Sequence, residues 1–187
     1  MKAVFGRYLW VDLSAEKITD KEIPERLYEL HLGGRGLASR LFLEYVPPGT
    51  DPFSPRNALV FATGPFQGTG LAGAGRHVVM AISPKTRSIA DSYVGGFLGH
   101  ELGRSGYDGI FITGKAVEPV YLLLYEGKAE LREARDLWGK FTGDVEKELR
   151  RRHPGARVAA IGPAGEELVS QACIIHDRNR AAGRPGL

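Results

Sequence analysis

Two short segments of the sequence combine glycine-rich turns with arginine side chains. Residues 73–76 read Gly-Ala-Gly-Arg, and residues 180–184 read Arg-Ala-Ala-Gly-Arg. A guanidinium group beside exposed backbone N–H groups can bind anionic oxygens through paired hydrogen bonds. Both segments are therefore candidate phosphate-binding sites. The alternative is that their arginines pair with carboxylates on the protein surface.

A third glycine segment, residues 68–73, matches the dinucleotide-binding pattern G-x-G-x-x-G and follows a predicted strand. That fingerprint requires a helix directly after the glycines, because the helix N-terminus binds the pyrophosphate. Here the following residues, Arg76-His-Val-Val-Met-Ala-Ile, have the apolar, β-branched character of a strand. The context argues against a Rossmann nucleotide site.

The remaining reactive residues form no complete catalytic or metal-binding set. The histidines show no metal-ligand spacing, and most are predicted to be surface or hydrogen-bonded residues: His31, His77, His100, His153 and His176. Cys173, the only cysteine, lies in a predicted apolar strand and is interpreted as a small buried hydrophobe rather than a nucleophile. One thiol excludes an internal disulfide, a cysteine-type zinc site and a complete iron–sulfur cluster supplied by this chain alone. No catalytic residue is assigned.

The composition is that of one globular domain over residues 1–187, with 43% hydrophobic residues. The net charge of +3, from 25 basic and 22 acidic residues, requires no nucleic acid partner. No apolar run reaches the roughly 18 residues of a membrane span and the N-terminus lacks a signal-peptide core, which predicts a cytoplasmic protein without membrane contact. The 25 glycines gather in short clusters, which indicates a backbone that approaches something closely at several places.

The hydrophobic patterns predict more strands than helices. Strands are predicted over residues 4–12, 18–23, 58–62, 77–82, 88–93, 109–113, 120–125, 129–133, 157–161 and 168–175. Helices are predicted over residues 24–45, with a break at Gly33-Gly34, and over residues 96–105 and 142–152. Few helices link successive strands, which favours an α+β fold. Residues 57–65 and 156–163 also resemble each other, as a strand followed by Gly-Pro, which suggests an internal duplication.

A series of motifs, in this order along the chain, resembles the N-terminal domain of the tungsten-dependent aldehyde ferredoxin oxidoreductases. The motifs are Gly33-Gly-Arg-Gly-Leu-Ala, Gly64-Pro65, Gly75-Arg76, Gly95-Gly96, Gly106-Tyr-Asp-Gly-Ile, Leu137-Trp-Gly-Lys, Ile161-Gly-Pro-Ala-Gly-Glu and Arg180-Ala-Ala-Gly-Arg. The resemblance implies an α+β fold of two related β-rich halves about a pseudo-two-fold axis, which form the base of a bis-pterin site. The internal duplication agrees with that description.

The resemblance also implies which residues touch the cofactor. Positions that contact pterin or phosphate in the family are matched by Arg76, Tyr93, Gly95, Gly96, Arg180, Ala181, Gly183 and Arg184. Main-chain carbonyls at Tyr93 and Ala181 match those that hold a magnesium ion between the two pterin phosphates. Tyr93-Val94 departs from the Asn-Ser common in the family, and Pro185 stands where glycine is usual.

The function implied is oxidation of aldehydes to carboxylic acids by a tungsten bis-pterin cofactor, with ferredoxin as the electron acceptor. In the family, two further helical domains enclose the cofactor and carry the cysteines of a 4Fe-4S cluster. This chain is therefore expected to act with the remaining domains of the enzyme or with a partner subunit. The alternative from another class is a non-catalytic module that binds a nucleotide or another phosphorylated ligand.

Overall fold

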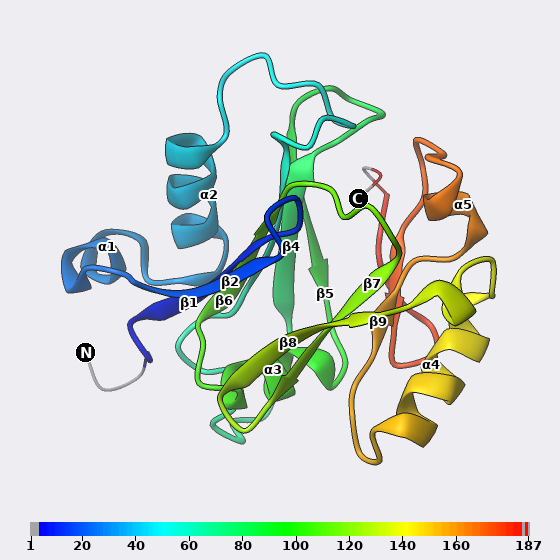
Figure 1. Ribbon diagram of the computed structural model, residues 1–187. Helices are drawn as coiled ribbons and strands as arrows, with labels where there is room; N and C mark the ends of the chain where they lie inside the picture. Colours follow the sequence, from blue (N-terminus) through cyan, green and yellow to red (C-terminus); the bar gives the residue numbers. More distant parts are fainter. Residues whose placement is uncertain (1–3, 185, 187) are drawn as a thin grey trace.

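The computed structural model describes residues 4–184 and 186 and is built around a six-stranded sheet (Figure 1). Its strands are β1 (Arg7–Asp12), β2 (Lys17–Glu22), β3 (Ala58–Ala62), β4 (His77–Ile82), β5 (Ile89–Val94) and β6 (Gly109–Thr113). They lie in the order β2-β1-β6-β3-β4-β5, with β1 and β6 parallel and the other neighbours antiparallel.

Two smaller sheets and several helices surround this sheet. The smaller sheets are the hairpin β7 (Val120–Tyr125) and β8 (Lys128–Glu133), and the sheet of β9 (Ala159–Ala160), β10 (Ile174–His176) and β11 (Arg180–Ala182) in the order β11-β10-β9. The helices are α1 (Glu25–His31), α2 (Gly34–Tyr45), α3 (Leu98–Arg104), α4 (Thr142–Arg152) and α5 (Pro163–Glu166), with a 3-10 turn at Arg135–Leu137. Figure 1 shows α1 and α2 on one side of the large sheet and β7–β8, α4 and α5 on the other. Among the described residues, no helix combines the length and the apolar character needed to cross a membrane.

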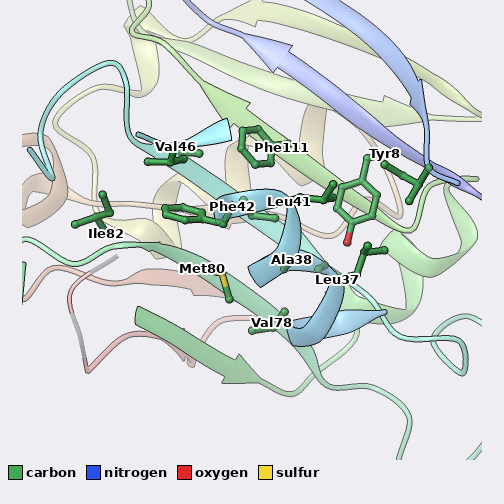
Figure 2. Close-up of a cluster of buried hydrophobic side chains, with 14 of the residues drawn as sticks. Tyr8, Leu37, Ala38, Leu41, Phe42, Val46, Val78, Met80, Ile82 and Phe111 are labelled. Carbon is green, nitrogen blue, oxygen red and sulfur yellow. The ribbon is translucent and has the colours of Figure 1, made fainter. Parts of the chain in front are cut away.

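The first hydrophobic core lies between α2 and the large sheet. Helix α2 buries Leu37, Ala38, Leu41 and Phe42 along one stripe, because residues three and four positions apart lie on the same face of a helix. Figure 2 shows these side chains beside those of the sheet, among them Phe111 of β6. Burying each large side chain contributes about 1.5–3 kcal/mol, which fixes α2 on the sheet.

The opposite face of the sheet forms a second core. Successive strand residues point to opposite faces, so Tyr8 joins the first core while Leu9 and Val11 join the second. The β7–β8 hairpin, α3 and β10–β11 cover this second core. Strand β4 is consequently buried on both faces along its whole length.

Close backbone contacts within the protein account for part of the glycine content. A Cβ added at Gly103 would lie 2.6 Å from the backbone of Gln67, and one added at Gly99 would lie 2.7 Å from the carbonyl oxygen of Gly75. Both glycines of α3 therefore let the helix backbone touch the loop that follows β3. That loop leads directly into β4, so no helix follows residues 68–73, as the sequence context predicts.

The structure confirms the mixed α and β content and most of the predicted elements. The predicted helix over 142–152 and the break at Gly33-Gly34 are present. The strand predicted over 168–175 is wrong for most of its length, because a strand forms only at Ile174–His176. Pro163 begins helix α5, which was not predicted, and Leu168 then takes a left-handed φ of 55°, which turns the chain. The predicted 157–161 strand is also shorter, as β9, and residues 180–182 form β11, where the sequence predicted only a turn.

Candidate functional site

A cavity of about 480 Å³ opens where the N-terminus of α2 meets the loop that follows β3. Its walls bring three of the glycine motifs together with two arginines and a tyrosine. The lining residues are His31, Leu32, Gly33, Gly34, Arg35, Gly36, Ala62, Gly64, Pro65, Gln67, Arg76, Val78 and Tyr93. The predicted site residues Arg76 and Tyr93 are therefore part of one cavity.

The N-terminus of α2 reaches this cavity through an unusual backbone turn. Leu32 has a left-handed φ of 62°, and Gly33 and Gly34 follow with φ values of 122° and 50°. The Gly34 N–H donates a hydrogen bond of 2.8 Å to the carbonyl oxygen of Thr63, at the end of β3. A Cβ added at Gly33 would lie 3.2 Å from that same oxygen, which is a tight contact, and the φ of 122° also favours glycine at this position.

The first turn of α2 presents positive charge to the cavity. The first N–H groups of an α-helix have no partner within the helix, and in α2 no side chain caps them and no acidic residue lies in the first turn. Arg35 adds a guanidinium group to this turn, 3.8 Å from the carboxylate of Asp91. The wall formed by α2 therefore favours an anionic group of a ligand.

A buried network behind the cavity holds Thr63 in place. The N–H and the hydroxyl of Thr63 both donate hydrogen bonds to the carbonyl oxygen of Asp108, each with a donor–acceptor distance of 2.9 Å. The Asp108 carboxylate accepts the hydroxyl of Tyr28 at 2.6 Å and the N–H groups of Phe5 and Gly6 at 3.0 Å and 2.8 Å. Burial and the hydrogen bond to Asp108 raise the pKa of Tyr28, so the phenol remains a donor. The network links α1, β3 and the N-terminal segment beneath the site.

Arg76 and Tyr93 both line the cavity, at two neighbouring strands of the large sheet. Arg76 immediately precedes β4, and its carbonyl oxygen accepts a hydrogen bond from the side-chain amide of Gln67. The side-chain oxygen of Gln67, Oε1, accepts a hydrogen bond of 2.6 Å from the N–H of Gly64. Tyr93, on β5, pairs with Val78 of β4. Both predicted residues are exposed, so their side chains are free to meet a ligand.

Gly95 and Gly96 connect this cavity to the β10–β11 hairpin. A Cβ added at Gly95 would lie 3.8 Å from Cγ of Arg76, and one added at Gly96 would lie 3.3 Å from Cγ of Arg180. The predicted residues from Arg76 to Arg180 therefore form one continuous row, although Gly95, Gly96 and Arg180 do not line the cavity itself. Ala181 is the exposed central residue of β11, which packs beside β5.

The end of the predicted arginine segment lies differently. Gly183 is buried, and a Cβ added there would lie 2.7 Å from Cβ of Cys173. Arg184 is exposed with a left-handed φ of 71°. Neither residue is among those that line the cavity, and Pro185 lies outside the described residues.

A buried histidine pair beneath the glycine pair was not predicted as part of the site. His77 is buried and neither of its ring nitrogens has a hydrogen-bond partner, so it is an exception to the prediction that most of the histidines are surface or hydrogen-bonded residues. Its ring centroid lies 5.2 Å from that of His176, whose Nδ1 lies 3.1 Å from Oδ2 of Asp177. Burial and the proximity of His176 lower the pKa of His77 to about 4. The only sequence signal was the position of His77 at the start of an apolar strand.

The described residues contain no group of three or more histidine, cysteine, aspartate or glutamate side chains that could hold a metal ion. A metal at this site would therefore need ligands of another kind, such as main-chain carbonyls or atoms of a bound cofactor. The arrangement itself provides two guanidinium groups, a helix N-terminus and glycine backbone along one row. These groups suit a ligand that bears phosphate.

Comparison with known proteins assigns this chain to a class. A family model described as the aldehyde ferredoxin oxidoreductase N-terminal domain matches residues 8–187. The tungsten-containing aldehyde ferredoxin oxidoreductase of Pyrococcus furiosus is 42% identical over 98% of this chain and 31% of its own length, and that of Pyrococcus abyssi is 40% identical over 100% and 31%. The fold and these relatives define a domain of an oxidoreductase.

A solved structure agrees with that class. The active site complex BamBC of benzoyl coenzyme A reductase, solved with 1,5-dienoyl-CoA, matches 98% of this chain and 28% of its own chain, with a TM-score of 0.95 and 40% sequence identity. More particularly, the chain belongs to the aldehyde ferredoxin oxidoreductase family, in which it corresponds to the N-terminal domain. It spans about a third of the length of the curated relatives that it matches.

Proposed function

We propose that this chain is the cofactor-binding domain of an oxidoreductase that oxidises aldehydes to carboxylic acids with a tungsten bis-pterin cofactor and ferredoxin as electron acceptor. The observation that carries the proposal is the cavity of about 480 Å³ between α2, Arg76 and Tyr93. The tungsten-containing relatives support the identity of the cofactor.

The residues present fit a flat ligand that bears phosphate. A Cβ added at Gly34 would meet no protein atom within 4 Å, and the nearest atom to one added at Gly95 is Cγ of Arg76 at 3.8 Å. These two glycines therefore leave space beside the backbone that only a ligand or solvent can fill. Arg35 and Arg76 line the cavity together with Gly34 and supply charge opposite to that of phosphate.

In this proposal the chain supplies binding and orientation, while the cofactor supplies the redox chemistry. Arg76, Tyr93, the Gly95-Gly96 pair and the segment from Arg180 to Arg184 would contact pterin and phosphate. The main-chain carbonyls of Tyr93 and Ala181 would hold a magnesium ion, whose charge would offset that of the phosphates. The large sheet and the β9–β11 sheet would belong to two halves related by a pseudo-two-fold axis, which form the base of the site. The 4Fe-4S cluster would take its cysteines from outside this chain.

A second candidate function is the reduction of an aromatic acyl coenzyme A thioester. The observation that favours it is the 40% identity to the benzoyl coenzyme A reductase complex, which equals the identity to the aldehyde oxidoreductase of Pyrococcus abyssi. The cofactor-binding role of this chain would be the same in both functions. Two assays of the complete enzyme, each with a viologen dye as electron acceptor, would separate them: oxidation of aldehydes, and oxidation of dienoyl-CoA to the aromatic acyl-CoA, which is the reverse of the reductase reaction.

The cofactor itself is tested by analysis of the complete enzyme purified from cells grown with tungstate. We expect tungsten, magnesium and pterin in a bis-pterin stoichiometry, measured by elemental analysis and by fluorescence of the oxidised pterin. A bound nucleotide without tungsten or molybdenum would contradict the proposal. That result would favour a non-catalytic module for a phosphorylated ligand.

A further inference from the structure

We propose that Asp177 is a positioning residue that holds the Gly95-Gly96 loop against the β10–β11 hairpin, so that both arms of the site are assembled before the cofactor binds. The inference rests on the proposed function, because the loop and the hairpin carry residues that we assign to the cofactor. Asp177 itself touches neither the cavity nor, in this proposal, the cofactor.

The Asp177 carboxylate joins two segments that are about 80 residues apart in the sequence. Its Oδ2 accepts the N–H of Phe97 at 2.6 Å and the N–H of Leu98 at 3.2 Å. Phe97 directly follows the glycine pair and occupies the N-cap position of helix α3, while Asp177 lies in the turn between β10 and β11. One carboxylate oxygen therefore fixes the end of the glycine loop to the hairpin that carries Arg180.

The contact is close enough to require glycine at position 96. A Cβ added at Gly96 would lie 2.5 Å from Oδ2 of Asp177 and 3.3 Å from both Cγ of Arg180 and Cε1 of His176. Gly96 also has a φ of 116°, which other residues rarely adopt. The Gly95-Gly96 loop, the Asp177 carboxylate and Arg180 of β11 are thus packed directly on one another.

Two further side chains lie beside the carboxylate, although Oδ1 accepts no hydrogen bond. Nδ1 of His176 lies 3.1 Å from Oδ2, and Nη1 of Arg157 lies 3.5 Å from Oδ1. Burial raises the pKa of Asp177, but the hydrogen bonds from Phe97, His176 and Leu98 outweigh it, so the pKa lies below its ordinary value. The carboxylate therefore stays ionised at neutral pH and accepts these hydrogen bonds at full strength.

The hairpin turn has a second anchor that provides a matched control. Asp177 and Arg178 have left-handed φ values of 45° and 69°, a conformation that persists only where neighbouring contacts enforce it. The N–H of Arg178 donates a hydrogen bond of 2.8 Å to Oε2 of Glu146, which belongs to α4. Glu146 thus contacts the same turn through a hydrogen bond that does not involve the Asp177 carboxylate. Loss of Glu146 removes this hydrogen bond and leaves those from Phe97 and Leu98 to Asp177 in place.

The first measurement is cofactor retention in the complete enzyme carrying Asp177→Ala, Asp177→Asn or Glu146→Ala. We expect Asp177→Ala to lose tungsten and pterin during dialysis at least about tenfold faster than the parent, since groups that orient ligands contribute on this scale. Asp177→Asn should lie between the parent and Asp177→Ala, and Glu146→Ala should match the parent. Equal loss in Asp177→Ala and Glu146→Ala, or parental retention in Asp177→Ala, would overturn the proposal.

The second measurement does not depend on the cofactor. In enzyme produced without tungstate, amide hydrogen exchange of peptides that span Phe97 and Leu98 should be at least about tenfold faster in Asp177→Ala and unchanged in Glu146→Ala. Unchanged exchange in Asp177→Ala would overturn the proposal that Asp177 holds the Gly95-Gly96 loop. A parent enzyme without tungsten and pterin would contradict the proposed function alone, and the exchange rates would still decide on Asp177. If Asp177→Ala does not fold, Asp177→Asn is judged by the same two readouts.

Discussion

The N–H of Gly34 lies 2.8 Å from the carbonyl oxygen of Thr63, and this hydrogen bond joins the first turn of α2 to the end of β3. The two elements form adjacent walls of the cavity that we assign to the cofactor. Their contact depends on the backbone of Gly33, which has a φ of 122°. The position of a positively polarised helix end thus follows from one glycine and one strand carbonyl.

We therefore expect Gly33→Ala to destabilise this chain by about 3 kcal/mol, because alanine neither adopts this backbone conformation easily nor fits beside Thr63. Gly34→Ala is the matched control. Its φ of 50° is accessible to alanine at a cost of about 1 kcal/mol, and the added Cβ meets no atom within 4 Å. Urea unfolding of both variants gives the comparison. Equal losses of unfolding free energy would contradict the contact between α2 and β3.

The Asp108 carboxylate should be the polar group whose loss destabilises the fold most. It is buried and accepts hydrogen bonds from Tyr28 and from the backbone of the N-terminal segment, so Asp108→Ala leaves several donors without a partner. We expect a loss of at least about 3 kcal/mol, against about 1–2 kcal/mol for Tyr28→Phe, which removes one of these bonds. The double variant should lose less than the sum of the single losses, because the partners are shared. Additive losses in urea unfolding would show that Tyr28 and Asp108 act independently.

Local sequence patterns predicted the fold where the hydrophobic spacing agreed with the packing. The helix over 142–152 is an example, since its apolar residues Val145 and Leu149 are four apart and both are buried. The predicted strand over 168–175 failed because Leu168 and Val169 are exposed, at 59% and 49% of their surface. Apolar residues on the surface carry the same pattern as apolar residues in a sheet, and only the turn after α5 distinguishes them here.

The sequence predicted only those residues of the candidate site that carry a local signal. Glycine beside arginine, as at Arg76, is a local signal that can be read from adjacent residues. The roles of His77 and Asp177 depend on contacts between residues about 80 or more positions apart, which leave no local pattern. Glycine is also ambiguous, since Gly99 serves a contact within the protein while Gly34 borders open space.

His77 should make the stability of this chain depend on pH in the acidic range. Burial, with His176 beside it, lowers the pKa of His77 from its ordinary 6.5 to about 4, and the nearby Asp177 opposes this only in part. Below pH 6.5 the unfolded chain binds a proton that the folded chain does not, so the stability is fully present above pH 6.5. The contribution of His77 to the free energy of unfolding, on the order of 3 kcal/mol, should be lost progressively as the pH falls from 6.5 to about 4.

The variant His77→Phe isolates this effect, because phenylalanine fills the same apolar site without a titrating ring. The carboxylates titrate in both proteins, so the difference between the two profiles of unfolding free energy against pH reports on His77. The parent should lose more stability than the variant between pH 6.5 and about 4. Parallel pH profiles for the two proteins would show that His77 is already protonated or solvated in the folded state.

Arg76 should contribute directly to cofactor binding in the complete enzyme. Arg76 lines the cavity, its Cγ lies close to Gly95, and the proposal assigns its side chain a contact with phosphate. Arg76→Ala should therefore weaken cofactor binding by about 1.5–3 kcal/mol through the loss of charge-assisted hydrogen bonds. Arg76→Lys should recover only part of this, because lysine keeps the charge but lacks the planar pair of donors. The control is Arg56→Ala, which removes an exposed arginine from the other end of β3. Tungsten and pterin content after purification gives the comparison, and equal content in Arg76→Ala and Arg56→Ala would remove Arg76 from the site.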